Sequence, residues 1–471
     1  MKVEQIYTGC LAHAAYYIES KGEVAIIDPL REVDPYIKRA KLDDAKIKYI
    51  FETHFHADFV SGHLDLKAKT GAQIVFGPTA KPGYDAIVAE DGQIFKIGDY
   101  KIKVIHTPGH TMESTTYLLI DENGKEHGIV TGDTLFIGDV GRPDLAQKIV
   151  SELTQEKLAA LLYDSLRNKI MPLSDDLIIY PNHGAGSACG KNMSKETTDT
   201  LGNQKRVNYA LRADMTKEEF IEELIDGLTE PPGYFPQNVM MNIKGYESFD
   251  KVMAKSHKPL NAKSFEAAAN ETEAIILDVR HQSEFVKGHI PRSIFIGIEG
   301  DFAPWVGAMI ADVSQLILLV SPVGKEQEVI TRLSRVGFDN VIGYLDGGFD
   351  AWKHSGMEYD TVTSIAAEEF ANRYSTIKEK VFDVRREGEY KAEHIEGAKH
   401  TPLNYLNNYL SEFPGNNTFY VHCAGGYRSV IAASILKSRG IHNLIEVAGG
   451  YDEIKKTEVP RTAYVCPSTL K

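Results

Sequence analysis

A short stretch near the start of the chain combines residue types that bind metal ions. Residues 53–59 read Thr-His-Phe-His-Ala-Asp-Phe, which places His54, His56 and Asp58 close together in sequence. Imidazole and carboxylate groups are common ligands of first-row transition metals. The apolar run at 47–51 is rich in β-branched and aromatic residues, so we predict a buried strand there. The sequence therefore predicts a metal site at the C-terminal end of this strand.

Three later stretches have the same layout, an apolar strand followed by possible metal ligands. The apolar residues end at 105, 130 and 180, and they are followed by His110, Asp133 and His183 respectively. A single histidine in such a position is more often structural than functional. Four strand ends that all supply such groups favour one shared metal site, because loops at one edge of a packed sheet converge.

A second chemical centre is the loop at 422–429, which reads His-Cys-Ala-Gly-Gly-Tyr-Arg-Ser. It lies between an apolar strand and an apolar helical stretch, so the thiol of Cys423 is expected to face backbone N–H groups and the positive end of a helix dipole. Gly425 and Gly426 let the backbone curl around the sulfur, and Arg428 adds positive charge. An isolated cysteine is by default structural, but this loop predicts a nucleophilic thiolate that carries a persulfide.

An internal repeat shows how this loop is positioned. The tripeptide Asp-Val-Arg at 278–280 recurs at 383–385, and Gly-Gly at 347–348 recurs at 449–450. In the first copy, Ser321 takes the place of the cysteine, and a serine hydroxyl cannot form a persulfide. We therefore expect the first copy to be catalytically silent and to serve as a spacer or docking surface.

The pattern of strands and helices divides the chain into three α/β domains. Residues 1–255 form the metal-binding domain, which ends in a Pro-Pro-Gly break and a polar connector. Residues 256–360 and 361–471 are the two repeat copies. In both copies apolar strands alternate with helical stretches, which is typical of an α/β domain with a parallel sheet.

Composition restricts the possible partners and the compartment. The net charge of −14 argues against nucleic acid or an anionic membrane surface as the main partner. No apolar run approaches the roughly 20 residues that cross a bilayer, and no export signal is recognisable at the start. Four cysteines in 471 residues do not form a disulfide framework. We therefore expect a cytoplasmic protein.

The metal-binding motifs resemble those of the metallo-β-lactamase superfamily. The shared features are Thr-His-x-His-x-Asp at 53–58, followed by His110, Asp133 and His183. The resemblance implies an αβ/βα sandwich with the metal between the sheet edges. Thr-Gly-Asp-Thr-Leu-Phe at 131–136 and Gly-Arg-Pro-Asp at 141–144 are similar to the persulfide dioxygenase branch, close to the glyoxalase II hydrolases. The two C-terminal copies resemble rhodanese domains, and the whole order resembles CstB-type fusions of these parts.

The ligand set indicates which metal is bound. Hydrolases of the superfamily hold two zinc ions, and a histidine next to the aspartate of the motif binds the second ion. Here Phe59 occupies that position, and a phenyl ring offers no lone pair. His54, His110 and Asp133 remain, a set with open positions that suits mononuclear, non-haem Fe(II). The resemblance assigns iron to the same three residues.

Other residues are assigned to the surroundings of the metal. His56, Asp58 and His183 are expected to orient the ligands, although His56 binds the metal in the hydrolases and the sequence leaves that open. The resemblance places the Gly-rich loop with Ser187 and Cys189 beside the substrate channel, where the Cys189 thiol exchanges sulfur; the alternative is a loop cysteine without function. Arg142 resembles a position near the thiol substrate, and a structural salt bridge with Asp144 is the alternative. Cys10 is expected in the core and Cys466 in a polar tail.

The resemblance implies a persulfide dioxygenase coupled to a sulfurtransferase. A low-molecular-weight thiol persulfide and O2 would give sulfite and thiol, and Cys423 would pass sulfane sulfur to sulfite to give thiosulfate, a route of sulfide detoxification. The thiol carrier stays open among glutathione, bacillithiol, coenzyme A and cysteine. Relatives of this class associate, so a homo-oligomer is expected. Two alternatives are a zinc-dependent, glyoxalase II-like thioester hydrolase whose rhodanese domains only bind, and a non-enzymatic sulfur-relay scaffold with a structural metal.

Overall fold

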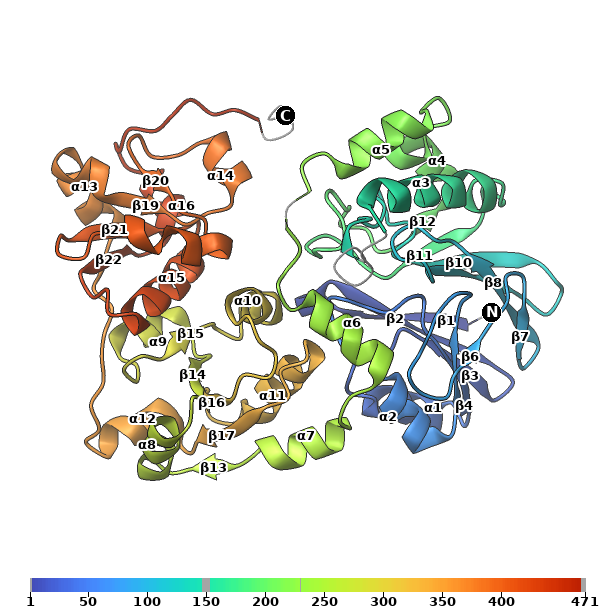
Figure 1. Cartoon of the computed structure of the whole chain (residues 1–471), viewed down its shortest axis with the longest axis horizontal. Coiled ribbons are helices and arrows are strands. Elements are labelled where there is room, and N and C mark those ends of the chain that lie inside the picture. Colours follow the sequence, from blue (N-terminus) through green and yellow to red (C-terminus); the bar gives the residue numbers. More distant parts are fainter. Residues whose placement is uncertain (1, 146–152, 229, 467–471) are drawn as a thin grey trace. The chain divides into compact units, whose positions relative to one another are not determined.

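The computed structural model describes residues 2–145, 153–228 and 230–466. It divides into two compact units (Figure 1). The first unit comprises Met1–Val252, Ala311–Val313 and Thr331–Phe338, and the second comprises Met253–Ile310, Ser314–Ile330 and Asp339–Lys471. A segment of the first repeat copy therefore belongs to the N-terminal unit. Arg335 of this segment donates from Nε to Oε1 of Glu32 at 3.0 Å.

Two six-stranded sheets form the centre of the N-terminal unit. The first sheet contains, in spatial order, β1 (Lys2–Thr8), β2 (His13–Ser20), β3 (Glu23–Ile27), β4 (Lys46–Phe51), β5 (Gln73–Phe76) and β6 (Ile87–Val88). The second contains β12 (Asp199–Thr200), β11 (Ile178–Pro181), β10 (Glu126–Gly132), β9 (Thr115–Ile120), β8 (Tyr100–His106) and β7 (Ile94–Ile97). Strands β3 to β6 pair with one another in the parallel sense, β2 pairs with β3 in the antiparallel sense, and β10 pairs with β11 in the parallel sense.

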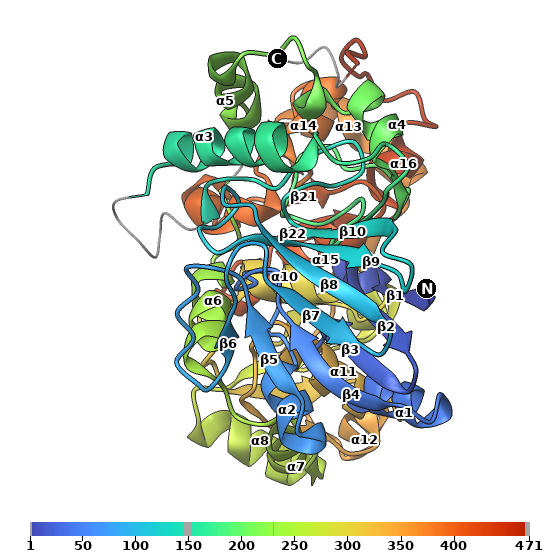
Figure 2. The same ribbon diagram turned by 90° about the vertical axis from the view of Figure 1, so that its right-hand side faces the viewer.

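Strands β9 and β11 of the second sheet are buried along nearly their whole length, which explains their largely apolar sequences. Val104 and Tyr117 pack against the first sheet, whereas their neighbours Ile105 and Leu118 pack against helices. These helices are α3 (Gln155–Ser165), α4 (Leu201–Val207) and α5 (Lys217–Ile225). Figure 2 shows α3 lying along this sheet. Helices α1 (Asp34–Leu42) and α2 (His63–Thr70) contact β4 of the other sheet, so the predicted αβ/βα sandwich is confirmed.

Two five-stranded parallel sheets make up the C-terminal unit, as predicted. The first is ordered β13 (Pro259–Leu260), β17 (Val341–Leu345), β16 (Ile317–Val320), β14 (Ile275–Asp278) and β15 (Ile294–Phe295). The second is ordered β18 (Ser364–Ile365), β22 (Leu444–Val447), β21 (Phe419–His422), β19 (Val381–Asp383) and β20 (Lys399–His400). Neighbouring strands in both sheets pair in the parallel sense.

Corresponding helices surround the two parallel sheets. The first copy contains α8 (Ala262–Glu271), α9 (Gln282–Lys287), α10 (Phe302–Met309), α11 (Glu326–Arg335) and α12 (Gly348–His354). The second contains α13 (Ala367–Ile377), α14 (Glu387–Ala392), α15 (Tyr427–Ser438) and α16 (Gly450–Ile454). Helices α6 (Phe235–Lys244) and α7 (Phe249–Ser256) precede them in the chain. Within the described ranges, none of the helices combines the length and the hydropathy needed to span a bilayer.

The repeated Asp-Val-Arg motif has a structural role. In the first copy Arg280 Nη2 lies 2.5 Å from Asp278 Oδ2, and in the second Arg385 Nη2 lies 2.7 Å from Asp383 Oδ2. All four side chains are buried. A buried charge requires a partner of opposite sign. The motif therefore holds the end of β14 in the first copy and the end of β19 in the second.

Candidate metal centre and thiol loop

The structure brings His54, His110 and Asp133 together at neighbouring strand ends. One ligand atom of each lies within 4.8 Å of those of the other two. Nε2 of His54 is 3.9 Å, and Nε2 of His110 is 3.4 Å, from Oδ2 of Asp133. All three side chains are buried. They come from the loops after β4 and β8 and from the residue directly after β10, as the strand-end layout predicts.

Hydrogen bonds at the opposite ring nitrogens fix the tautomers of both histidines. Nδ1 of His54 lies 3.0 Å from Oγ1 of Thr53, and this hydroxyl donates to Oδ2 of Asp28 at 2.9 Å. The Nδ1 atom must therefore donate. Nδ1 of His110 donates to the backbone oxygen of Arg142 at 2.8 Å. Each Nε2 then carries a lone pair directed toward Asp133, which is the arrangement of metal-binding histidines.

Most of the converging atoms have no hydrogen-bond partner within the described part of the chain. Among the residues that the structure describes, Nε2 of His54 and both carboxylate oxygens of Asp133 are buried without a hydrogen bond. Burial, together with the neighbouring histidines, lowers the pKa of His54 well below its ordinary value, so its imidazole is neutral. A buried carboxylate without partners is costly. Two imidazoles whose Nε2 atoms face Asp133, together with its carboxyl group, therefore fit a divalent cation, and the chemistry of these groups accommodates iron or zinc.

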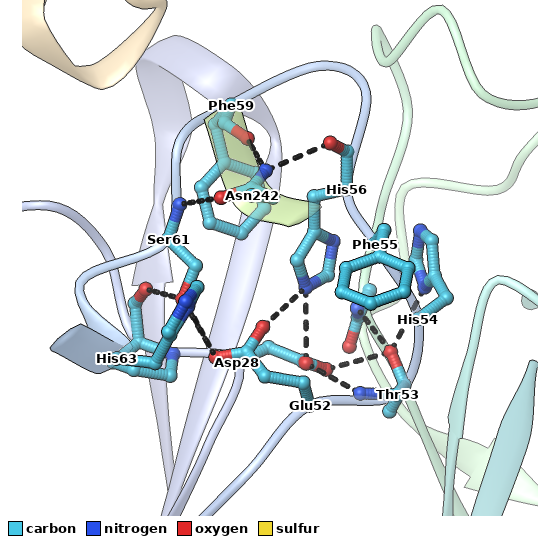
Figure 3. Close-up of polar contacts among 12 residues, drawn as sticks. Asp28, Glu52, Thr53, His54, Phe55, His56, Phe59, Ser61, His63 and Asn242 are labelled. Atoms are coloured by element: carbon cyan, nitrogen blue, oxygen red, sulfur yellow. Dashed lines mark hydrogen bonds and ion pairs between the residues drawn. The ribbon is translucent and has the colours of Figure 1, made fainter. Parts of the chain in front are cut away.

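His56 is held by carboxylates that the sequence analysis missed. Its Nε2 donates to Oδ1 of Asp28 at 3.0 Å and lies 3.3 Å from Oε2 of Glu52 (Figure 3). Burial opposes protonation, but these two carboxylates raise the pKa of His56 well above its ordinary value. Nδ1 of His56 is buried and has no hydrogen-bond partner in the described part of the chain. Nε2 of His56 thus faces two carboxylates and is not available to a metal ion. Asp28 directly follows an apolar strand, so the pattern that identified His54, His110 and Asp133 could also have identified Asp28.

Asn242 of α6 holds the loop that carries His56 and was not predicted either. Its Nδ2 donates to the backbone oxygens of His56 and Phe59 at 2.8 and 2.9 Å, and its Oδ1 accepts from the N–H of Ser61 (Figure 3). An amide that is buried in a helix far along the sequence gives no local signal of this role.

A second group of possible ligands lies beside the first. It contains Asp58, His183 and Cys189, with one ligand atom of each within 4.8 Å of the others. Nε2 of His183 is 3.5 Å from Oδ2 of Asp58 and 3.5 Å from Oδ1 of Asp133. Burial, and the carboxylates of Asp58 and Asp133, raise the pKa of the Cys189 thiol well above its ordinary value. Cys189 is therefore part of the centre rather than a peripheral loop residue.

Phe59 fills the position at which the two-zinc hydrolases have a ligand. Its side chain is fully buried, and its ring centroid lies 4.3 Å from those of His13 and His56. The ring therefore packs against imidazoles instead of donating a lone pair. The second group thus has a thiol from a distant loop but no histidine next to Asp58, a combination that the sequence alone did not reveal.

Arg142 and Ser187 shape the loop that carries Cys189. Nε and Nη2 of Arg142 each donate to Asp144 at 2.7 Å, and its Nη1 donates to the backbone oxygen of Ala188 at 3.2 Å. Oγ of Ser187 accepts from the N–H of Cys189 at 3.1 Å. Arg142 therefore forms the structural salt bridge with Asp144 and also holds the loop over the centre.

The loop between β21 and α15 curls around the thiol of Cys423. The N–H of Gly426 donates to Sγ at 3.1 Å, and Gly426 has a φ of +92°, which favours glycine. A Cβ on Gly450 would lie 2.4 Å from the backbone oxygen of Cys423, so the recurring Gly-Gly pair allows this close approach. Gly425 is exposed. The thiol lies at the helix N-terminus, as predicted.

The predicted positive charge beside the thiol is balanced by a carboxylate. Nη1 and Nη2 of Arg428 donate to the two carboxylate oxygens of Glu389 at 2.6 and 2.8 Å. Such a two-point pair fixes the guanidinium group. Glu389 lies on α14, 39 residues before Arg428 in the same copy, so the local sequence gave no sign of this pair. Arg428 therefore contributes less net charge than the sequence suggested.

Comparisons with known proteins agree with this division. The model of the rhodanese-like domain matches residues 261–355 and 366–457, and that of the metallo-beta-lactamase superfamily matches residues 8–82. The hydroxyacylglutathione hydrolase GloC of Haemophilus influenzae is 29% identical over 217 residues, which is 41% of this chain and 90% of that protein. A hydroxyacylglutathione hydrolase of Rhodopseudomonas palustris is 30% identical over 42% of this chain and 80% of its own length. A solved metallo-beta-lactamase of Staphylococcus aureus is 30% identical with a TM-score of 0.63, over 73% of this chain and 98% of its own.

Proposed function

This chain belongs to the metallo-β-lactamase superfamily and carries two rhodanese-like domains, and we propose that it is a persulfide dioxygenase coupled to a sulfurtransferase. Its substrates would be a low-molecular-weight thiol persulfide, O2 and sulfite. The observation that carries the proposal is the convergence of His54, His110 and Asp133 on one point, with Phe59 where a second metal ion would need a ligand. A ferrous ion held by these three residues would supply the redox chemistry for the reaction of O2 with the persulfide sulfur.

The surrounding residues would orient this centre. Thr53 and the backbone oxygen of Arg142 hold the two imidazoles in the required tautomer. Residues around the site are mostly buried, which excludes bulk water and strengthens electrostatic interactions. Cys189 lies beside Asp58 and His183, where an incoming sulfur compound would meet it.

Cys423 would perform the sulfur transfer. Its thiolate attacks the outer sulfur of a persulfide, the S–S bond of that persulfide breaks, and the thiol leaves. Sulfite then attacks the outer sulfur on Cys423, the new S–S bond breaks, and thiosulfate leaves with regeneration of the thiolate. The N–H of Gly426, which already donates to Sγ, supports the negative charge in both steps.

Replacing the thiol tests this coupling. In Cys423→Ser we expect persulfide-dependent O2 uptake to stay largely intact, while the product changes from thiosulfate to sulfite. Oxygen-electrode measurements with a panel of thiol persulfides, combined with ion chromatography of the products, report both. An unchanged yield of thiosulfate would refute the role of Cys423.

A zinc-dependent thioester hydrolase is the second candidate, and two findings favour it. Asp58, His183 and Cys189 form a group that could hold a second ion beside Asp133, and two of the relatives are hydroxyacylglutathione hydrolases. Hydrolysis of a hydroxyacylglutathione thioester by the zinc-loaded protein, without O2 uptake on persulfides by the iron-loaded protein, would establish this alternative.

A further inference from the structure

A buried carboxylate that the proposed sulfur transfer does not use lies next to the Cys423 loop. Glu446 is on β22, and its exposed fraction is 2%. Oε1 of Glu446 accepts from Oγ of Ser429 at 2.9 Å, and Oε2 accepts from Oγ of Ser364 at 2.6 Å. Two hydroxyl donors thus hold the carboxylate in a fixed orientation.

Ser429 connects this carboxylate to the thiol. Its Oγ lies 3.5 Å from Sγ of Cys423, within hydrogen-bond distance for sulfur. Ser429 is fully buried and Cys423 is 1% exposed, so bulk water has little access to the thiol proton. A continuous path of hydrogen bonds therefore leads from Sγ through one hydroxyl to Oε1 of Glu446.

We propose that Glu446 accepts the proton of Cys423 through Ser429. The S–H bond breaks as its proton moves to Oγ of Ser429, and the proton that Oγ already carries moves to Oε1 of Glu446. The products are a thiolate and a neutral carboxylic acid. This inference rests on the proposed sulfur-transfer role of Cys423, which needs a thiolate as the attacking group.

The relay moves a negative charge without adding one to the buried loop. Before the transfer the charge is on Glu446, and afterwards it is on Sγ, where the N–H of Gly426 donates. Burial raises the pKa of Glu446, although both serine donors act in the opposite direction. A carboxylate that binds a proton more tightly than an exposed one is suited to accept it from a thiol.

The other charged groups around the loop are paired with each other. Arg428 pairs with Glu389 of α14, and Arg385 pairs with Asp383 of β19. Nε2 of His422, on β21, lies 3.8 Å from the same aspartate. Burial lowers the pKa of His422. Within the described part of the chain, Glu446 is therefore the charged group that is linked to Sγ by hydrogen bonds through another side chain, that of Ser429.

The silent copy lacks every member of the relay. Counting back by the spacing of the two Gly-Gly pairs, Ser321 corresponds to Cys423, Gln327 to Ser429 and Tyr344 to Glu446. The first copy thus lacks the thiol, the hydroxyl and the carboxylate together. This is expected if the three groups serve one function.

A thiolate titration of the full chain tests the relay. The ultraviolet absorbance of the thiolate is followed against pH, and the spectrum of Cys423→Ser is subtracted. Because the thiol and Glu446 share one proton, we expect two steps with a plateau between them. Glu446→Gln keeps the size of the side chain but cannot accept a proton. We expect a single step that lies between the two steps of the unaltered chain, because the thiolate no longer forms beside a carboxylate.

Two further variants make the result decisive. Ser429→Ala interrupts the path and should give the single-step curve of Glu446→Gln, so it decides the outcome if the latter fails to fold. Ser434→Ala removes another buried serine of α15, whose Oγ donates to the backbone oxygen of Ile431, and should leave two steps. Two-step curves in Glu446→Gln or Ser429→Ala would overturn the relay. The titration uses no sulfur donor, so it can fail while persulfide loading of Cys423 in the unaltered chain still supports the proposed function.

Discussion

The backbone N–H of Gly324 donates to Oε1 of Glu326 at 3.0 Å. In the second repeat copy the corresponding N–H, that of Gly426, donates to Sγ of Cys423 at 3.1 Å. The two copies therefore use the same backbone donor for different side-chain partners. In the first copy a carboxylate of the chain thus accepts from the backbone N–H whose counterpart in the second copy donates to the sulfur of Cys423.

This difference predicts that a cysteine alone does not activate the first copy. In Ser321→Cys, made together with Cys423→Ser, we expect no persulfide on the introduced thiol. Glu326 occupies the amide donor, and Pro322 has no N–H. Mass spectrometry after incubation with a thiol persulfide measures the loading, with the unaltered chain as the positive control. Loading as fast as at Cys423 would contradict this explanation.

Asp28 should control metal affinity without touching the metal. It accepts from the N–H of Thr53 at 2.8 Å and from Oγ1 of Thr53 at 2.9 Å, and it holds His56. We expect Asp28→Asn to weaken metal binding by about 10- to 100-fold, the usual effect of losing a partner that orients a ligand. Competition with a chelator measures this affinity. Asp99→Asn, at an exposed aspartate, is the control, and equal affinities in both variants would rule out the role of Asp28.

The ion pair of the repeated motif should contribute strongly to stability. Arg280→Met leaves the buried carboxylate of Asp278 without its cation, and we expect a loss of about 3–5 kcal/mol. Lys325→Met removes an exposed pair with Glu328 in the same copy and should cost about 0–1 kcal/mol. Trp305 and Trp352, the two tryptophans of the chain, both lie in the C-terminal unit, so their fluorescence in urea reports its unfolding. Similar losses in both variants would contradict the structural role of the motif.

The pair between Arg428 and Glu389 predicts a pH dependence of stability. Burial opposes ionisation, but Arg428 lowers the pKa of Glu389 below its ordinary value of about 4.3. A lowered pKa in the folded state stabilises the fold above that ordinary value, and the stabilisation is lost as the pH falls through the folded pKa. The melting temperature of the unaltered chain should therefore exceed that of Arg428→Gln at neutral pH, and the difference should shrink in acid. Calorimetry across this range measures it, and a difference that grows in acid would have the wrong sign.

The convergence of His54, His110 and Asp133 could be predicted because each lies shortly after an apolar strand. Strand ends meet at one edge of the sandwich, so the position of His110 or Asp133 in the sequence already implied its place in the fold. Cys423 was predictable for a similar reason, because its loop lies between a strand and a helix that are both apolar.

Side-chain pairings between distant segments were not predictable. Asn242 reaches the His56 loop from α6, Cys189 returns to Asp58 through a long loop, and Glu446 meets Ser429 only after the parallel sheet has formed. The sequence around each of these residues does not distinguish it from a residue that has only a structural role. The ion pair of Arg428 with Glu389 could not be predicted for the same reason, because Glu389 lies on another helix.

The metal content of protein purified without oxygen tests the central claim most directly. If His54, His110 and Asp133 hold a single ferrous ion, elemental analysis should find one iron per chain and O2 uptake on persulfides should follow the iron content. His110→Ala removes a ligand and should lose both, whereas His106→Ala, at a histidine outside the group, should keep both. Two zinc ions per chain, with no O2 uptake after iron loading, would contradict the account.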